Sequence, residues 1–254
     1  MMKLAVLSAL LGSAAAFTTS TNSLPSIARS VQKSSLNMET KADLEVLAKK
    51  CNPVIGFYDP IGLSDAEFWG YSNEATIGWI RHAEIKHGRI AMFAFVGYIA
   101  AANGVHFPWA MQLDGTPFPD ITNPPALWDA VSDDAKTQIF GVIFFLEWWS
   151  EFGGKHYMAG GKPGDFPDFK GAEGMPHYVP FNFYDPFGFS KNMSEEKKES
   201  RLVAEINNGR LAMIGILGFL AEQTTPGSVP ALSSVVQHYD GEPMAPFVNN
   251  YLIH

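Results

Sequence analysis

The chain has 254 residues, of which 46% are apolar, including 19 Phe and 6 Trp. This supplies enough apolar surface for one sizeable core or a small membrane bundle. The formal net charge is -8, and no block of Lys and Arg forms a basic stripe, so nucleic acid is not an expected partner. The single cysteine, Cys51, excludes an intramolecular disulfide and any multi-cysteine metal site.

The N-terminus has the composition of a two-part targeting sequence. Residues 1–16 combine a charged start at Lys3 with an apolar core and small residues before Phe17, and they predict a signal peptide. Residues 17–38 are rich in Ser and Thr and hold no acidic residue, which predicts an organelle transit segment. The order of the two segments resembles the import address of plastids bounded by extra membranes. A secreted protein with a polar spacer is the alternative. We expect residues 39–254 to form a single domain.

An internal repeat organises the rest of the chain. The segment FYDPIGL at 57–63 recurs as FYDPFGF at 183–189, and EIKHGRIAM at 84–92 recurs as EINNGRLAM at 205–213. The two offsets, 126 and 121 residues, differ only by five residues of loop. Two linked motifs in the same order predict a duplicated structural unit.

Three apolar runs have the composition of helices. They cover 90–102, 139–149 and 211–221, and none reaches the roughly 18 to 20 apolar residues that announce a membrane span. When they are extended through the neighbouring polar residues, they predict three transmembrane helices at about 80–102, 137–153 and 201–223. The expected fold is therefore an all-α membrane protein.

The distribution of charge between these helices supports a membrane orientation. Between residues 103 and 137 there is one basic residue, Lys136, against five acids, and no Lys or Arg follows Arg210. The segment between the second and third helices is instead rich in lysine. Such alternation is what the positive-inside rule predicts for three spans, with the N-terminus and the second loop on the stromal side.

The polar residues at the start of the first and third helices need partners, because an isolated charge in a bilayer costs about 2.5–3.5 kcal/mol. The repeat provides them if the two helices cross about a pseudo-two-fold axis. Glu84 would then lie beside Arg210, and Glu205 beside Arg89. Each carboxylate would keep a second oxygen free to bind another group.

His87 and Asn208 lie three residues after these glutamates, on roughly the same helix face. Carboxylate, amide and imidazole groups are the axial donors that a magnesium tetrapyrrole needs, since the ring leaves one position open and magnesium prefers hard oxygen ligands. Gly88 and Gly209 would let a partner helix or a flat ring approach closely. A purely structural charge network is the alternative.

With these motifs the sequence resembles the chlorophyll a/b and chlorophyll a/c light-harvesting family, over about residues 51–240. The resemblance implies that the first and third helices form the crossed pair and that a short amphipathic C-terminal helix follows. It implies that the Asp-Pro turns help to seat carotenoids. It makes Arg89 and Arg210 structural ion-pair partners. The chlorophyll ligands that it implies are Glu84, His87, Glu205, Asn208, Gln223, Gln138, Glu147 and His238. Gln138 and Glu147 are nine residues apart, which departs from the eight of the family pattern.

The function implied by this resemblance is a non-enzymatic antenna subunit in the plastid thylakoid membrane. Its cofactors would be chlorophyll a, chlorophyll c and fucoxanthin-like carotenoids. Its partners would be a photosystem core, neighbouring antenna subunits and thylakoid lipid. A photoprotective quencher of the same fold is the nearest alternative. Because Glu-x-x-His also occurs in di-iron bundles, a di-iron carboxylate enzyme is a further one, and transport a third.

Overall fold

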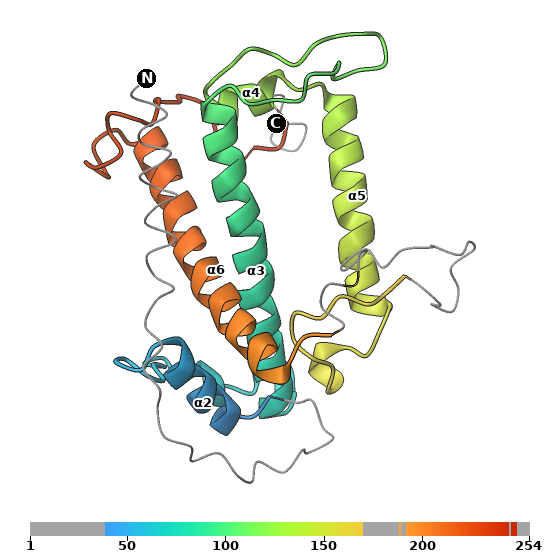
Figure 1. Ribbon diagram of the computed structural model, residues 1–254, viewed down its shortest axis with the longest axis vertical. Helices are drawn as coiled ribbons and strands as arrows, with labels where there is room; N and C mark the ends of the chain where they lie inside the picture. The colour runs from blue at the N-terminus through green and yellow to red at the C-terminus, as the bar shows by residue number, and fades with distance from the viewer. Residues whose placement is uncertain (1–38, 170–187, 189–191, 244, 248–254) are drawn as a thin grey trace. The chain divides into compact units, whose positions relative to one another are not determined.

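The computed structural model describes residues 39–169, 188, 192–243 and 245–247. These residues, drawn in colour in Figure 1, form two compact units. Among the described residues, the first unit combines 39–94 with 133–169, 188 and 192–216, and the second combines 95–132 with 217–243 and 245–247. The predicted signal and transit segments, 1–16 and 17–38, and the second FYDP motif at 183–187 lie outside the described residues.

The secondary structure is helical. The α-helices are α2 (Lys41–Cys51), α3 (Asn73–Ala102), α4 (Pro124–Ala130), α5 (Asp133–Phe152) and α6 (Glu195–Thr224). Short 3₁₀ turns lie at Leu63–Asp65, Phe68–Gly70 and Tyr157–Ala159. No strand occurs in the ranges that the structure describes, so the expected all-α fold is confirmed.

The long helices start earlier than their apolar runs suggest, because serine caps hold their first turns. The Ser72 hydroxyl accepts a hydrogen bond from the Ala75 N–H at 3.4 Å, which lets α3 begin at Asn73. Ser194 accepts from the Lys197 N–H at 3.4 Å, and Glu195 adds a favourable negative charge to the first turn of α6. At 30 residues each, α3 and α6 are about 45 Å long.

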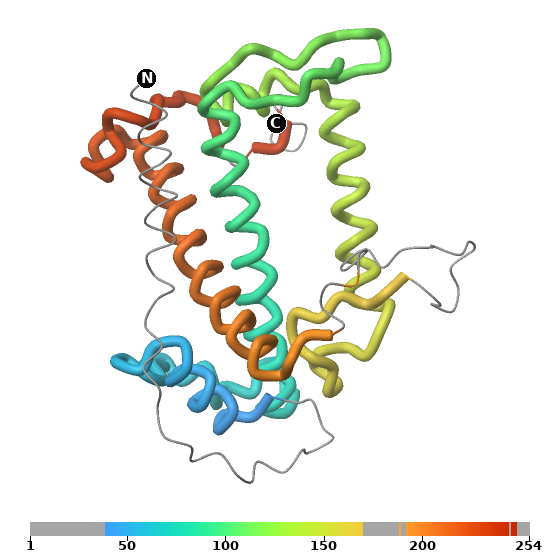
Figure 2. Tube along the Cα trace, viewed as in Figure 1, coloured from blue at the N-terminus to red at the C-terminus, as the bar shows by residue number. Residues whose placement is uncertain are grey.

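The first unit is built on the contact between α3 and α6, which lie side by side there. Figure 2 shows the Cα traces of the two helices approaching each other within this unit. α5 and the residues after it pack against α3, and α2 covers the start of α3. A capping box between Thr40 and Asp43 fixes the first turn of α2.

The first Asp-Pro motif forms a turn directly before α3. The Asp59 carboxylate accepts hydrogen bonds from the Ser64 N–H at 2.8 Å and the Leu63 N–H at 3.0 Å. The bond from Ser64 contributes most to lowering the pKa of Asp59 below its usual value. A charged Asp59 therefore stabilises this turn at neutral pH.

In the second unit, the prediction of an amphipathic C-terminal helix is wrong. After Thr224 the described chain makes consecutive turns instead, with hydrogen bonds such as Leu232 N–H to the Val229 carbonyl. Pro226 cannot continue the hydrogen-bond pattern of α6, and Gly227 adopts a φ of 87°, outside the helical region. Glu222 accepts from the backbone N–H groups of Gly227 and Val229, at 2.8 and 2.7 Å, and holds the turns against the end of α6.

α3, α5 and α6 contain most or all of the three stretches predicted as spans, 80–102, 137–153 and 201–223. Within the described part of the chain, no helix combines the length and the apolar composition by which hydropathy identifies a membrane crossing.

Candidate functional site

α3 and α6 meet at a contact between two glycines, called the crossing below. A Cβ atom built on Gly209 would lie 2.9 Å from the Cα of Gly88, and one built on Gly88 would lie 3.1 Å from the Cα of Gly209. Both residues belong to the repeated motif and both are buried. The crossing therefore requires residues without a side chain in both copies of the repeat.

Replacing Gly209 with alanine should force the two backbones apart. We expect Gly209→Ala to destabilise the folded protein by about 1–3 kcal/mol, the usual cost of overpacking. Gly97→Ala on α3 is the matched control, because no atom lies within 4 Å of its added Cβ and alanine favours a helix by up to about 1 kcal/mol. Thermal unfolding of the two variants checks this, and equal unfolding temperatures would contradict the steric role of the crossing.

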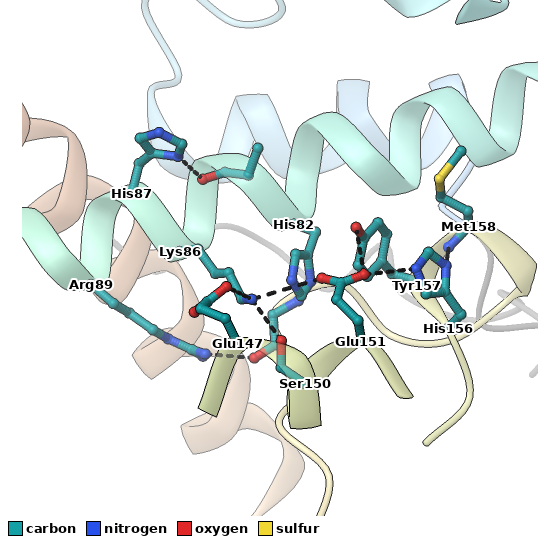
Figure 3. Close-up of polar contacts among 12 residues, drawn as sticks. His82, Lys86, His87, Arg89, Glu147, Ser150, Glu151, His156, Tyr157 and Met158 are labelled. Carbon is teal, nitrogen blue, oxygen red and sulfur yellow. Dashed lines mark hydrogen bonds and ion pairs between the residues drawn. The ribbon is translucent and has the colours of Figure 1, made fainter. Parts of the chain in front are cut away.

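Two ion pairs flank the crossing, and each joins one copy of the repeat to the other. The Arg89 Nε donates to the Glu205 Oε1 at 2.6 Å, and Arg210 donates to the Glu84 Oε1 at 2.7 Å. Arg89 also donates to the Gly164 carbonyl at 2.5 Å (Figure 3). This is the crossed arrangement that the repeat suggests.

Sequence reasoning missed a third arginine at the crossing. Arg81 is buried, pairs with the second oxygen of Glu84 and bonds Glu39 through its Nε at 3.0 Å. The expected free oxygen on Glu84 is therefore already engaged, although each carboxylate oxygen has two lone pairs and can accept a further partner. The spacing of three residues between Arg81 and Glu84 could have predicted this ion pair, because residues three apart are neighbours on a helix. The second copy lacks this arginine, because its equivalent position holds Leu202.

His87 lies one helical turn from this network, and one of its ring nitrogens has no hydrogen-bond partner among the described residues. Its Nδ1 lies 2.8 Å from the Ala83 carbonyl, which can only accept, so Nδ1 carries the proton and Nε2 keeps a lone pair (Figure 3). His87 is exposed, and so is Asn208 at the equivalent position of α6. Both side chains are therefore accessible to a ligand from outside the helix pair.

The candidate ligands on α5 differ in their surroundings. Gln138 is exposed near the start of the helix. Glu147 is also exposed but binds the Lys86 ammonium through Oε2 at 2.6 Å. Around this pair, Glu151 binds the His156 Nε2 at 2.8 Å and the Tyr157 hydroxyl at 3.1 Å (Figure 3). The tyrosine ring in turn stacks on His82, with ring centroids 3.9 Å apart.

The remaining two candidates lie in the second unit. Gln223 is fully buried, and its Nε2 donates to Asn123 at 2.8 Å, while its Oε1 has no hydrogen-bond partner among the described residues. His238 uses both ring nitrogens: Nδ1 donates to the Gln223 carbonyl at 2.8 Å, and Nε2 lies 2.8 Å from Asp240. Gln223 thus has an oxygen to spare, whereas His238 must leave Asp240 before it can bind anything else.

A cavity of about 550 Å³ adjoins the crossing, within the first unit. Its walls are mostly apolar and come from α2, from the turn after it and from the start of α3. Its polar lining includes Arg81, Glu84 and Arg210. An apolar space beside a charge-neutralised carboxylate suits a large flat ligand that needs one polar contact.

The donor set fits the magnesium of a chlorophyll. Glutamate oxygens whose charge is balanced by arginine, an imidazole with a free Nε2 and an amide side chain each supply one lone pair without adding net charge. Fold and site together define a helical protein that presents such neutral axial donors around a tight crossing of two helices.

Comparison with known proteins identifies the family to which this helical protein belongs. The sequence model of the chlorophyll A-B binding proteins matches residues 44–224. The chloroplastic fucoxanthin-chlorophyll a-c binding protein of Trieres chinensis is 33% identical over 240 residues, covering 92% of this chain and all of that protein. Protein F of the same name from Phaeodactylum tricornutum is 32% identical over 87% of this chain and 95% of the relative. Protein D of the same name from Macrocystis pyrifera is 32% identical over 73% of this chain and 88% of that relative. The chain belongs to the chlorophyll a-b binding protein family.

Proposed function

We propose that this protein is a light-harvesting antenna subunit that binds chlorophyll a, chlorophyll c and fucoxanthin-like carotenoids and passes excitation energy to a photosystem. The observation that carries the proposal is the crossing, where two glutamates are neutralised by arginines of the opposite repeat. The names of the fucoxanthin-chlorophyll a-c binding relatives support the choice of pigments.

The ligands proposed for the chlorophyll magnesium are, at the crossing, Glu84, His87, Glu205 and Asn208. Bound chlorophyll supplies the light absorption and the transfer of excitation energy. The protein's residues hold and orient it: Glu205 has an oxygen beyond its bond to Arg89, and His87 has a free Nε2. The further proposed ligands are Glu147, Gln138, Gln223 and His238.

We propose that α3, α5 and α6 lie in the thylakoid membrane of a plastid. An exposed apolar stripe supports this, because it recurs at equivalent positions of the repeat. Ile90, Phe93 and Val96 are exposed on α3, and their counterparts on α6 are the equally exposed Leu211, Ile214 and Leu217. Large exposed apolar surfaces need cover, here from lipid, pigment or neighbouring antenna subunits. The chloroplastic relatives support the location.

Protease protection tests this orientation and the processing of the N-terminus. Protease added to the stromal face should cut the lysine-rich segment 155–198 and spare the loop 114–134. After removal of the targeting sequence, the mature chain should begin between about residues 35 and 40. A start no later than Glu39 is favoured, because Glu39 binds Arg81 and Thr40 caps α2. Mass spectrometry of the protease fragments gives the cleavage sites, and the mass of the uncleaved mature protein gives its N-terminus. Stromal cleavage of the 114–134 loop would mean that the orientation is inverted.

Two other functions make distinct spectroscopic predictions. A quenching relative would bind the same pigments but show a strongly shortened fluorescence lifetime. A di-iron enzyme would show a ferric charge-transfer band without chlorophyll. The second copy of the repeat favours the antenna, because a di-iron bundle needs two Glu-x-x-His motifs and the second copy has Asn208 in place of the histidine.

The absorption and fluorescence excitation spectra of the purified protein test the proposal directly. We expect chlorophyll a and c bands together with efficient transfer of energy from the carotenoid to chlorophyll a. A protein purified from thylakoid membranes without chlorophyll would refute the proposed function.

A further inference from the structure

Lys86 is a charged residue of the repeated block whose role the crossing does not explain. It lies on α3, where the second copy of the repeat has Asn207. Asn207 donates to the Cys51 carbonyl at 3.1 Å, so the two equivalent positions face different neighbours. Lys86 faces α5 instead, and Figure 3 shows its ammonium group among the side chains of that helix.

Three side chains on one face of α5 surround the Lys86 ammonium group. Its Nζ lies 2.6 Å from the Glu147 Oε2, 2.6 Å from the Ser150 Oγ and 3.9 Å from the Glu151 Oε1. Residues spaced by three and four lie on the same face of a helix. Two of these neighbours, Glu147 and Ser150, accept hydrogen bonds from the ammonium group, and Glu151 contributes only charge at its longer distance.

The two glutamates of this face are not equivalent. Glu151 is already held by His156 and Tyr157. Glu147 is bound by Lys86 through Oε2, and its side chain is 57% exposed while that of Lys86 is 24% exposed. The Lys86 bond therefore neutralises Glu147 and fixes its orientation, and Oε1 can still bind another group on the exposed face of α5.

The same pattern recurs at the crossing. Glu84 is paired with Arg210 and Glu205 with Arg89, and in each case the cation comes from another helix. Glu147 with Lys86 is a third pair of this kind, formed between α5 and α3. A carboxylate that must leave water needs such a cation, because an uncompensated charge is costly in a low-dielectric site.

We propose that Lys86 is a positioning residue for Glu147: it neutralises the carboxylate and orients Oε1 to serve as the axial ligand of a chlorophyll bound on the exposed face of α5. The inference rests on the proposed pigment-binding function. It also distinguishes the two candidates on this helix, because among the described residues α3 makes an ion pair with Glu147, whereas Gln138 is neutral and exposed.

The experiment uses the pigment-loaded protein and four variants. Glu147→Ala removes the ligand, Lys86→Gln removes only the positioning charge, Lys86→Arg keeps the charge, and the fourth variant combines Lys86→Gln with Glu147→Ala. Ser150→Ala is the matched control, since it removes another partner of Lys86 but leaves the ion pair. For each variant we measure chlorophylls per polypeptide, the low-temperature absorption difference spectrum against wild type, and the unfolding temperature.

We expect Glu147→Ala to lose one chlorophyll and to give one negative band in the difference spectrum. Lys86→Gln should show the same band and lose at least half of the occupancy of that site. The double variant should lose no more than Glu147→Ala alone, because both changes act on one site. Lys86→Arg and Ser150→Ala should keep the chlorophyll, with the band shifted at most.

Three outcomes would overturn the inference while the proposed function stands. They are full occupancy in Lys86→Gln, full occupancy in Glu147→Ala, and a double variant that loses additional chlorophylls and unfolds at a lower temperature than either single variant. The last would mean that Lys86 only ties α5 to α3. A wild-type protein without chlorophyll would overturn the inference and the proposed function together.

Discussion

Replacing Arg210 with leucine should strongly reduce assembly of the pigment-loaded protein. The change removes the cation that pairs with the Glu84 Oε1 across the two copies of the repeat. Breaking a buried ion pair costs about 3–5 kcal/mol. We expect no more than the lower end of this range, because the Arg210 side chain is half exposed and Glu84 keeps its second partner, Arg81. Since each 1.4 kcal/mol is a factor of ten, the yield of refolded complex should fall by up to about a hundredfold.

His87→Ala is the matched control, because it removes a neutral donor on the same part of the scaffold. We expect this variant to refold with nearly normal yield and to lose or weaken one chlorophyll. The comparison separates the structural role of the charges from the ligand role of the histidine. An Arg210→Leu protein that assembles with a full pigment complement would mean that the crossed pair is dispensable.

Exchanging the charges of each pair should give different results at the two sites. Arg89→Glu with Glu205→Arg preserves an ion pair, so assembly should recover to within about 1 kcal/mol of wild type, whereas each single change costs about 3 kcal/mol. Glu84→Arg with Arg210→Glu should not recover. The new arginine at position 84 would lie beside Arg81, which is buried and already holds the carboxylate there.

A further substitution tests whether repulsion from Arg81 is what prevents recovery in the second exchange. Adding Arg81→Leu to the second exchange removes the repulsion and introduces the residue that the other copy carries, Leu202. We expect this triple variant to refold better than the exchange alone, yet to lack the chlorophyll assigned to Glu84. Refolding yield and pigment stoichiometry measure both effects. Equal recovery of the two exchanges without Arg81→Leu would contradict the role given to Arg81.

From the repeat, the sequence could predict the contacts at the crossing but not the contacts with residues outside the repeat. A Glu-x4-Arg spacing present twice determines the crossed pairs once two helices face each other through Gly88 and Gly209. The repeat did not reveal Arg81 or Lys86, because neither residue is repeated in the second copy and their partners Glu39 and Glu147 lie outside the repeat. The pairing of Arg81 with Glu84 could have been read only from their spacing of three residues. The proposed C-terminal helix was an inference from family pattern, and Pro226 and Gly227 redirect the chain there.

The mutual contacts at the crossing also constrain which substitutions the two copies of the repeat can accept in evolution. Gly88 forms the steric surroundings of Gly209, and each arginine depends on the glutamate of the other copy, so a substitution in one half is tested against the other half. Such positions must change together or not at all, and they are identical in both copies. Positions 81 and 86, which also bind residues outside the repeat, differ from their counterparts Leu202 and Asn207. A duplicated scaffold can therefore keep a symmetric centre while each half acquires its own surroundings.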